Sequence, residues 1–421
     1  MKMLRISPLV KEASTLVSGN AVAQAISLLA YLVLTRIYTP EDYALFNIFY
    51  SYIEVLIILS TCKYEMAIVV ARNEAESAAV ARVALLLNTA VSLLLLAVAT
   101  LLYLTHSLPG NFGQIGAVVL LIPPMVFLCG TSRVYEFIFN RALRYRTMAT
   151  NALINSTTGS AFKIGFGLLG MHRAGMPLGT VLGQACANVA YRIQLRRLDL
   201  PKPSRQEMTA AARAHHNFPY FVATKDFVNS LSANLPFLWL ALWFDQAEVG
   251  LLGLALTFLC RPANLVNSAV ERVLYARTAQ QVQQHAAIGG VIRRYLWMVN
   301  AVALPVCVVG WFIAEPLFAF FFGGRWAGCG IYVQALLPWV FLSLSSTPLT
   351  FVSNILSTQR TEFFFYLGLL ALRAAAIGAG IMAGSFLLAV RLYATAGALV
   401  SVSLLVWYLW QVRRYERNLT S

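Results

Sequence analysis

Acidic side chains are scarce in this sequence. Only 17 of its 421 residues are Asp or Glu, against 32 Lys and Arg, which leaves a formal net charge of +15. Such a balance can indicate nucleic-acid binding, but no basic cluster here is interleaved with stacking aromatics on a soluble stretch. Positive residues between apolar segments more often determine the orientation of membrane spans. We therefore expect no nucleic acid among the partners.

Motifs for nucleotide, metal or covalent chemistry are also absent. There is no G-x-x-x-x-G-K-[ST] phosphate-binding loop, so the chain has no ATPase motif of its own. None of the six cysteines forms a C-x-x-C pair, which argues against a disulfide or a metal site. No polar segment is long enough to carry paired catalytic carboxylates or a Ser/His/Asp set. We therefore expect no catalytic residues, no metal and no enzyme activity.

Long apolar runs dominate the rest of the chain. Hydrophobic residues make up 59% of it and the mean hydropathy is +0.68, far above the values of a soluble domain. The runs are continuous, whereas an outer-membrane barrel would need short alternating segments. We predict an all-α polytopic membrane protein with twelve transmembrane helices, at residues 14–35, 42–61, 82–104, 114–132, 148–170, 176–194, 218–243, 249–270, 292–313, 331–356, 363–383 and 390–410.

Basic residues are distributed unevenly between the segments that connect these spans. With the N-terminus placed in the cytoplasm, nearly all connecting Lys and Arg residues fall on the cytoplasmic side. This asymmetry predicts that both ends of the chain are cytoplasmic. The basic residues left on the outside are Arg36, Arg173, Arg325 and Arg391.

The spans divide into two sets of six. The stretch at residues 42–46 recurs in weaker form at 248–252, and each opens the second span of its half. Because six is an even number, both halves begin on the same side, and we expect a pseudo-two-fold axis along the membrane normal. The predicted parts are an N-terminal six-helix lobe at 1–195, a cytoplasmic linker at 196–217 and a C-terminal six-helix lobe at 218–421.

The linker has a helix signal of its own. Ser204 is followed three residues later by Glu207, which predicts a capping box and a short surface helix. His215 and His216 stand at the end of this stretch. We interpret them as solvated interface residues, with a pH switch as the alternative.

Residues 217–244 form the most unusual span, because polar side chains interrupt it. At about 100° per residue, Lys225, Asn229 and Ser232 fall on one stripe, with Asp226 and Ser230 beside it. A spanning helix with a wet face and an apolar face borders a water-filled cavity or a polar bundle interior. This span is therefore predicted to border the transport pathway.

Four further charges lie inside predicted spans: Glu54, Lys163, Arg261 and Arg373. A charge at the bilayer centre costs at least about 2.5–3.5 kcal/mol, so each needs water, a partner or a substrate. The alternative to a functional role is that these charges form internal ion pairs that hold helices together. For Lys163, the alternative is that the small residues on its face of the helix allow close packing against a neighbouring helix. At the predicted cytoplasmic ends, snorkelling accounts for the charges of Lys63, Glu65, Arg133 and Glu136.

Several stretches resemble the polysaccharide-export family of lipid-linked oligosaccharide flippases, in the superfamily that also holds the multidrug and toxic-compound exporters. The resemblance covers nearly the whole chain. It is carried by SGNAVAQAISLLAYLVLTRIYTPEDYALFNIF, KYEMAIVVARNEAES, HHNFPYFVATKDFVNSLSANLP, EVGLLGLALTFLCRPANLVNSAV and FFGGRWAGCGIYVQALLPWVFLSLSSTPLTFVSNILSTQRTE.

The resemblance implies two six-helix lobes around a cationic cavity in the bacterial inner membrane. Its implied cargo is a polyprenyl-diphosphate-linked glycan, flipped from the cytoplasmic to the periplasmic leaflet. Further expected partners are membrane lipids and the polymerase and glycosyltransferase machinery of polysaccharide synthesis. We expect a coupling proton or sodium ion at Asp226 or Glu54, and cargo binding by Lys225, Arg261, Arg373, Asn229 and Lys163.

Two other functions stay open from the sequence. A multidrug or cation antiporter would share the fold, but should favour acidic, aromatic pockets over intramembrane cations. A membrane glycan polymerase or ligase would need a sizeable extracytoplasmic loop, and the longest predicted outer interval is only about 315–330.

Overall fold

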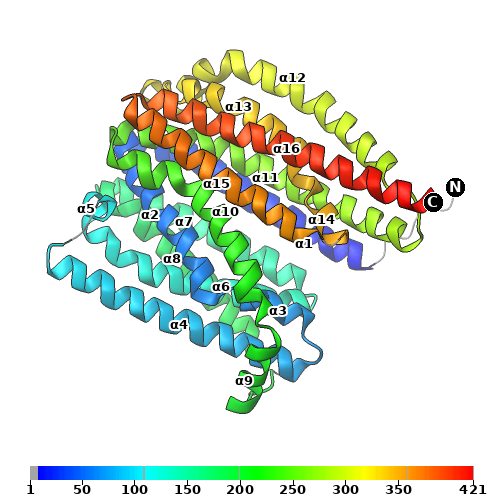
Figure 1. The fold of residues 1–421 in the computed structure, drawn as a ribbon. Helices are drawn as coiled ribbons and strands as arrows, with labels where there is room; N and C mark the ends of the chain where they lie inside the picture. Colours follow the sequence, from blue (N-terminus) through cyan, green and yellow to red (C-terminus); the bar gives the residue numbers. More distant parts are fainter. Residues whose placement is uncertain (1–7, 108–109, 199, 357, 421) are drawn as a thin grey trace. The chain divides into compact units, whose positions relative to one another are not determined.

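The computed structural model describes residues 8–107, 110–198, 200–356 and 358–420, and these are almost entirely helical (Figure 1). They form two compact units that divide between Ser230 and Leu231, inside helix α10. The lobe boundaries expected from the sequence stay a prediction.

The N-terminal unit consists of nine helices, two irregular helical turns and the start of α10. A 3₁₀ turn covers Gly116–Leu121 and a π-helical turn covers Phe218–Ala223. The helices are α1 (Pro8–Ile37), α2 (Pro40–Thr61), α3 (Tyr64–Val70), α4 (Glu74–Leu104), α5 (Asn111–Ile115), α6 (Ile122–Arg141), α7 (Tyr145–Leu168), α8 (His172–Leu195) and α9 (Arg205–Ala214).

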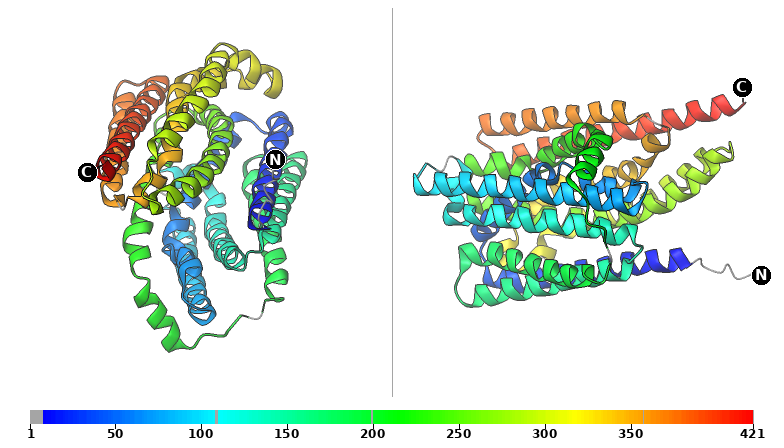
Figure 2. Two further views of the ribbon diagram at one scale, coloured as in Figure 1. Left: turned by 90° about the vertical axis from the view of Figure 1, so that its right-hand side faces the viewer. Right: turned by 90° about the horizontal axis from the view of Figure 1, so that it is seen from below.

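The C-terminal unit holds the rest of α10 and the helices that follow it. Short 3₁₀ turns lie at Leu240–Leu242, Gly324–Trp326 and Thr347–Leu349. The helices are α10 (Thr224–Trp239), α11 (Gln246–Gln283), α12 (Gly289–Phe322), α13 (Cys329–Ser346), α14 (Phe351–Ile355), α15 (Gln359–Met382) and α16 (Phe386–Thr420). Helices α15 and α16 run side by side (Figures 1 and 2).

Each of the twelve predicted spans coincides with a helical segment, which confirms the all-α membrane fold. Among the described residues, nine helical segments are individually long and apolar enough to cross a membrane. Large apolar side chains on α4 and α12 are exposed, for example Leu94 at 64% and Phe312 at 76%. A lipid-facing surface explains this exposure, because lipid replaces the protein core as the apolar surroundings. The protein is therefore a multi-pass membrane protein.

Helix starts follow the capping signals of the sequence. The predicted box in the linker is confirmed: Glu207 N–H donates to the Ser204 hydroxyl at 3.3 Å, and Ser204 N–H donates to the Glu207 carboxylate at 2.6 Å. That backbone N–H holds the pKa of Glu207 below its usual value. An equivalent box at Thr39 and Asp42 starts α2. These caps satisfy N–H groups that the first helical turn leaves unpaired.

Close packing of α7 on α8 accounts for the small residues near Lys163. A Cβ added to Gly183 would lie 2.5 Å from the Cα of Gly159, and one on Gly179 only 2.6 Å from the Lys163 backbone nitrogen. Glycine is needed at such positions because the two backbones approach each other directly. The Lys163 ammonium lies 5.0 Å from the centre of the Phe46 ring. Its surroundings therefore favour the packing interpretation over cargo binding.

Candidate functional site

The polar face of α10 is divided between the two units. Lys225 and Asp226 are half-buried and Asn229 is exposed, all on the part of the helix that belongs to the N-terminal unit. Ser232 is fully buried in the C-terminal unit, which agrees with the polar bundle interior and not with the water-filled cavity at this position. Its hydroxyl accepts a hydrogen bond from Arg373 of α15 at 3.3 Å, which replaces water as its partner.

Asp226 forms an ion pair, which is the internal-pairing alternative, with a partner that the sequence did not identify. Its Oδ2 lies 2.8 Å from the Nζ of Lys63, and the side chains are 36% and 21% exposed respectively. Lys63 directly follows α2, where Cys62 and Lys63 both adopt left-handed backbone with φ of 48° and 59°. This conformation costs a non-glycine residue about 1–3 kcal/mol, so surrounding contacts must hold it. Lys63 is therefore a paired residue, and the snorkelling interpretation is wrong for it.

The first two residues of α3 reach two other elements. The Tyr64 hydroxyl donates to the Ala212 carbonyl of α9 at 3.1 Å. Glu65 is only 3% exposed, and its Oε2 has no hydrogen-bond partner among the described residues. Burial, and then the charge of Glu65, raise the pKa of the Cys62 thiol at the α2–α3 junction above its usual value.

Helix α6 carries a charge of each sign in its second half. Arg133 is exposed, and Glu136, three residues later on the same helix, is half-buried. The interpretation that Arg133 snorkels to the membrane surface stays a prediction.

Glu54 lies on the stretch of α2 that runs beside α10. Its side chain is exposed, and its backbone carbonyl accepts a hydrogen bond from the Ser230 hydroxyl at 3.0 Å. Together with the ion pair of Asp226, this contact brings both carboxylates predicted for ion coupling to neighbouring helices. The charged groups of this region are mixed in sign: Glu54, Lys63, Glu65, Arg133, Glu136, Lys225 and Asp226.

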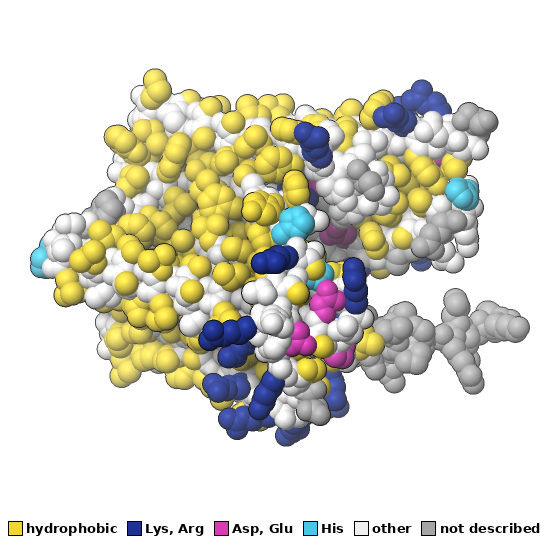
Figure 3. Space-filling model, turned by 60° about the horizontal axis from the view of Figure 1, so that its bottom comes forward, with side chains coloured by type: hydrophobic (Ala, Val, Ile, Leu, Met, Phe, Trp, Pro, Cys, Tyr) yellow, Lys and Arg dark blue, Asp and Glu magenta, His cyan; other side chains and the backbone are white. Residues whose placement is uncertain are grey.

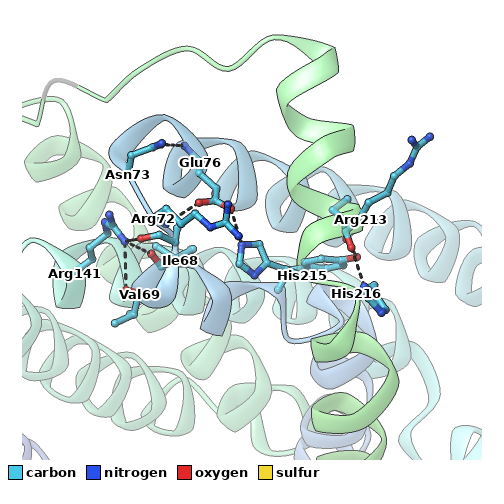
Figure 4. A network of polar contacts seen from close by, with 12 residues as sticks. Ile68, Val69, Arg72, Asn73, Glu76, Arg141, Arg213, His215 and His216 are labelled. Atoms are coloured by element: carbon cyan, nitrogen blue, oxygen red, sulfur yellow. Dashed lines mark hydrogen bonds and ion pairs between the residues drawn. The ribbon is translucent and has the colours of Figure 1, made fainter.

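A second polar network holds α3 at its far end (Figure 4). From the end of α6, Arg141 donates to the carbonyls of Ile68 and Ala71 at 2.9 and 2.8 Å, and pairs with Glu74 of α4 at 2.9 Å. Next to it, His215 and Glu76 point toward one another, with Nε2 and Oε1 3.1 Å apart (Figure 4). The linker helix α9 is thereby joined to α4.

Lys and Arg side chains gather in the region of α9, whereas hydrophobic side chains cover much of the rest of this face (Figure 3).

In the C-terminal unit, Arg261 lies on a face of α11 that is partly accessible. Arg261 is half-buried, and Asn264 and Ser268, further along the same helix, are exposed. Pro262 follows Arg261 inside the helix and supplies no backbone N–H. Cargo binding by Arg261 stays a prediction.

Arg373 has a different environment. It is 3% exposed, and its guanidinium carbon lies 4.6 Å from the Trp339 ring centre and 4.1 Å from that of Tyr393. Stacking on aromatic faces stabilises a buried guanidinium through cation–π attraction. Its Nε and Nη2 find no hydrogen-bond partner among the described residues. Arg373 is therefore enclosed by its own unit, out of contact with solvent.

The structure thus adds contacts of two residues that the sequence interpretation set aside, namely Lys63 and Tyr64. The available signal was the polar run Lys63, Tyr64 and Glu65 just after the second span. The partners of Lys63 and Tyr64 could not be predicted, because α9 and α10 lie far along the chain from α3.

The family model described as polysaccharide biosynthesis protein matches residues 33–330. Among curated proteins, none matches the sequence.

Solved structures show the same fold at low identity. The lipid II flippase MurJ in an inward closed conformation is 11% identical with a TM-score of 0.71, and the match covers 96% of this chain and 90% of that one. A multidrug resistance MATE family transporter of the MOP superfamily, in an inward-facing conformation, is 13% identical with a TM-score of 0.65, over 94% and 96% of the two chains. A MOP superfamily transporter from Pyrococcus furiosus is 12% identical with a TM-score of 0.63, over 97% and 96%.

The family model covers well over half of the sequence, and the fold agrees along nearly its whole length with transporters of one superfamily. The chain therefore belongs to the polysaccharide biosynthesis protein family and has the fold of the MOP superfamily transporters.

Proposed function

We propose that this protein flips a polyprenyl-diphosphate-linked oligosaccharide repeat unit from the cytoplasmic to the periplasmic leaflet of the bacterial inner membrane. The observation that carries the proposal is the family match over residues 33–330, on a fold shared with a lipid II flippase. Movement occurs by alternating access, with an ion gradient or the membrane potential as the energy source. Both termini lie in the cytoplasm, where the linker and its basic residues then also lie.

The cargo-binding role falls mainly on Lys225 and Arg261. A diphosphate that leaves water needs charge compensation, and Arg offers a planar fork matched to phosphate oxygens. Both side chains are half-buried, and the exposed Asn229 lies one turn from Lys225, where it can donate to a sugar hydroxyl. Arg373 is enclosed, so its proposed role is to tune the C-terminal unit. A coupling proton or sodium ion binds at a carboxylate of the N-terminal unit.

A multidrug antiporter is the second candidate, because MATE transporters share the fold. The family match and the cations at Lys225 and Arg261 favour the glycan cargo. The cargo is moved without being changed, since the function needs no covalent chemistry. The polymerase and glycosyltransferase machinery then supplies and consumes it.

The test is a leaflet-transfer assay with purified protein in liposomes that contain a polyprenyl-diphosphate glycan. The expected result is movement of intact glycan to the opposite leaflet, measured by its accessibility to an added glycosidase. Empty liposomes, and liposomes with heat-denatured protein, serve as controls. Release of free polyprenyl diphosphate or a longer glycan would show an enzyme, and export of cationic drugs without glycan movement would show an antiporter.

A further inference from the structure

Arg373 of α15 carries a positive charge inside the C-terminal unit. It is 3% exposed, and it forms no ion pair with a carboxylate among the residues that the structure describes. A buried charge is unfavourable unless an opposite charge and hydrogen-bond partners compensate it. What compensates this charge must therefore lie directly around the guanidinium.

The helices in contact with Arg373 place their acidic residues far from it. Its hydrogen bond and ring contacts are to α10, α13 and α16. Neither α13 nor the part of α10 in this unit has an Asp or Glu. Glu362, the acid of α15, is about three turns from Arg373, and Glu416 of α16 is about six turns from Tyr393. These helices therefore offer the guanidinium no carboxylate.

Two aromatic rings and one hydroxyl compensate the charge only in part. The faces of Trp339 and Tyr393 attract the guanidinium, but they do not replace oxygen acceptors for its N–H groups. A guanidinium has five N–H donors and no acceptor. The Ser232 hydroxyl accepts from Nη1 at 3.3 Å. The donors on Nε and Nη2 still need an acceptor.

The donors without a partner lie on one edge of the guanidinium. Nε and Nη2 of Arg373 are buried, and neither has a hydrogen-bond partner within the described part of the chain. The N–H bonds on this edge run nearly parallel, so both can reach a single acceptor, as in bidentate pairs of Arg with a carboxylate or phosphate. Two parallel donors on a positive group are suited to bind an anion.

The indole of Trp339 brings a third donor to this edge. A Cβ added to Gly397 would lie 3.0 Å from Arg373 Nη2 and 2.8 Å from Trp339 Nε1. The two nitrogens therefore approach the same point beside α16, at a position where glycine has no side chain. An indole N–H can donate but cannot accept. An acceptor at this point is thus shared by two side chains from different helices.

The enclosure of the site favours a small anion. Arg373, Ser232, Tyr393 and Gly397 are all buried. A phosphate with a lipid or sugar attached could reach Arg373 only if the surrounding helices separated. A halide ion is small, carries the single negative charge that the guanidinium requires, and accepts hydrogen bonds from several directions.

We propose that a chloride ion binds inside the C-terminal unit, to the Nε and Nη2 edge of Arg373 and to the indole N–H of Trp339. The chloride neutralises the buried guanidinium and links α15 to α13 beside Gly397. This site is distinct from the cargo contacts proposed at Lys225 and Arg261. It does not rest on the proposed function.

Chloride binding is tested by thermal unfolding of the purified protein in detergent, in buffers of equal ionic strength in which chloride replaces gluconate. An ion that binds only the folded state raises the ratio of folded to unfolded protein, by about a hundredfold at a hundred times its Kd. The unfolding temperature of the wild type should rise with chloride. A wild type that unfolds at the same temperature in both anions overturns the proposal.

Two tryptophan variants test the assigned donor. Trp339→Phe keeps a ring beside the guanidinium but removes the N–H, so the chloride concentration for half-saturation should rise about ten- to hundredfold, as for a lost hydrogen bond to a charged group. Trp311→Phe on α12 removes the indole N–H of an exposed tryptophan and should bind chloride like the wild type. Equal half-saturation in the two variants overturns the assignment.

Two arginine variants test the charge. Arg373→Met should remove the chloride dependence of the unfolding temperature, whereas Arg360→Met, at an exposed position at the start of α15, should retain it. A chloride dependence that persists in Arg373→Met overturns the proposal. If Arg373→Met does not fold, the two tryptophan variants decide.

The position and identity of the anion are tested separately. Crystals grown with bromide in place of chloride should show an anomalous scattering peak in contact with Arg373 and Trp339, and peaks only elsewhere would overturn the site. Inorganic phosphate, added to the gluconate buffer, should not raise the unfolding temperature. A rise that Trp339→Phe abolishes would assign the site to phosphate and overturn the chloride proposal. None of these measurements uses the glycan, so they stand or fail independently of the proposed function.

Discussion

The ammonium of Lys63 lies 2.8 Å from the carboxylate of Asp226, so the junction after α2 is ion-paired to the polar helix α10. Each residue alone would be a charge near the membrane interior, and together they are neutral. Because the pair is partly exposed, it contributes little to the free energy of unfolding, and its main effect is to fix which part of α10 faces α3.

The first prediction concerns variants that remove or reverse this ion pair. Lys63→Met or Asp226→Asn should lower the unfolding free energy by only about 0.2–1 kcal/mol, as for other partly exposed pairs. Glycan export per molecule should fall more clearly, because the start of α10 loses its position. The double variant Lys63→Asp with Asp226→Lys restores the attraction and should recover part of the export. Export in the double variant no better than in either single variant would contradict a role for the pair.

The packing around Arg373 gives a stability prediction. A Cβ at Gly397 would lie 2.7 Å from Trp339 Cδ1 and 3.0 Å from Arg373 Nη2. Gly397→Ala should therefore push the stacked rings apart and destabilise the protein by roughly 1–3 kcal/mol, as overpacking does elsewhere. The matched control is Gly378→Ala on α15, where nothing lies within 4 Å. There the higher helix propensity of Ala should leave stability equal or raise it by about 0.5–1 kcal/mol. Thermal unfolding in detergent is measured for both glycine variants. Equal shifts of the unfolding temperature in the two variants would contradict the enclosed arrangement of Arg373.

If Arg261 binds the cargo, we expect that a positive charge at position 261 is not enough for full binding. Arg261→Lys should weaken binding by about ten- to hundredfold, because a lost charge-assisted hydrogen bond is worth about 1.5–3 kcal/mol. Arg261→Ala should nearly abolish export. Arg360→Ala, which removes an exposed arginine at the start of α15, is the control. The measurements are glycan binding in detergent and export normalised to the protein in the membrane.

Lys225 is tested in the same assays. Lys225→Ala should weaken glycan binding more than it lowers the unfolding temperature, since the side chain is only half-buried. Full export and unchanged binding in the double variant Lys225→Ala with Arg261→Ala would mean that neither charge contacts the cargo.

The orientation of the chain is a further prediction. Single cysteines in place of Gln206 on α9 and Gln246 at the start of α11, in a cysteine-free background, are treated with a membrane-impermeant thiol reagent in intact cells. Residue 246 should react and residue 206 should not, because the basic linker is expected in the cytoplasm. The opposite labelling pattern would invert the topology.

Local signals predicted local structure well. The Ser204 and Glu207 box lies where the sequence placed it, because both partners of a capping box belong to one turn. The spans coincide with helices for a similar reason: lipid requires every backbone N–H and C=O to be bonded within its own helix. Helical periodicity placed Ser232 on the polar stripe of its span, and the structure buries it against another helix. Periodicity defines the faces of a helix, but it does not say which neighbour covers them.

The sequence by itself determined a multi-pass helical membrane protein of the polysaccharide biosynthesis family, with its spans, its linker helix and its intramembrane charges. Only the tertiary structure decided which of those charges meet. It paired Lys63 with Asp226, bonded Arg373 to Ser232, and placed the Arg373 guanidinium against two aromatic rings. The physical reason is that hydropathy and helix capping act within a few residues, whereas a buried charge is compensated by groups that only the packing of distant helices brings into reach.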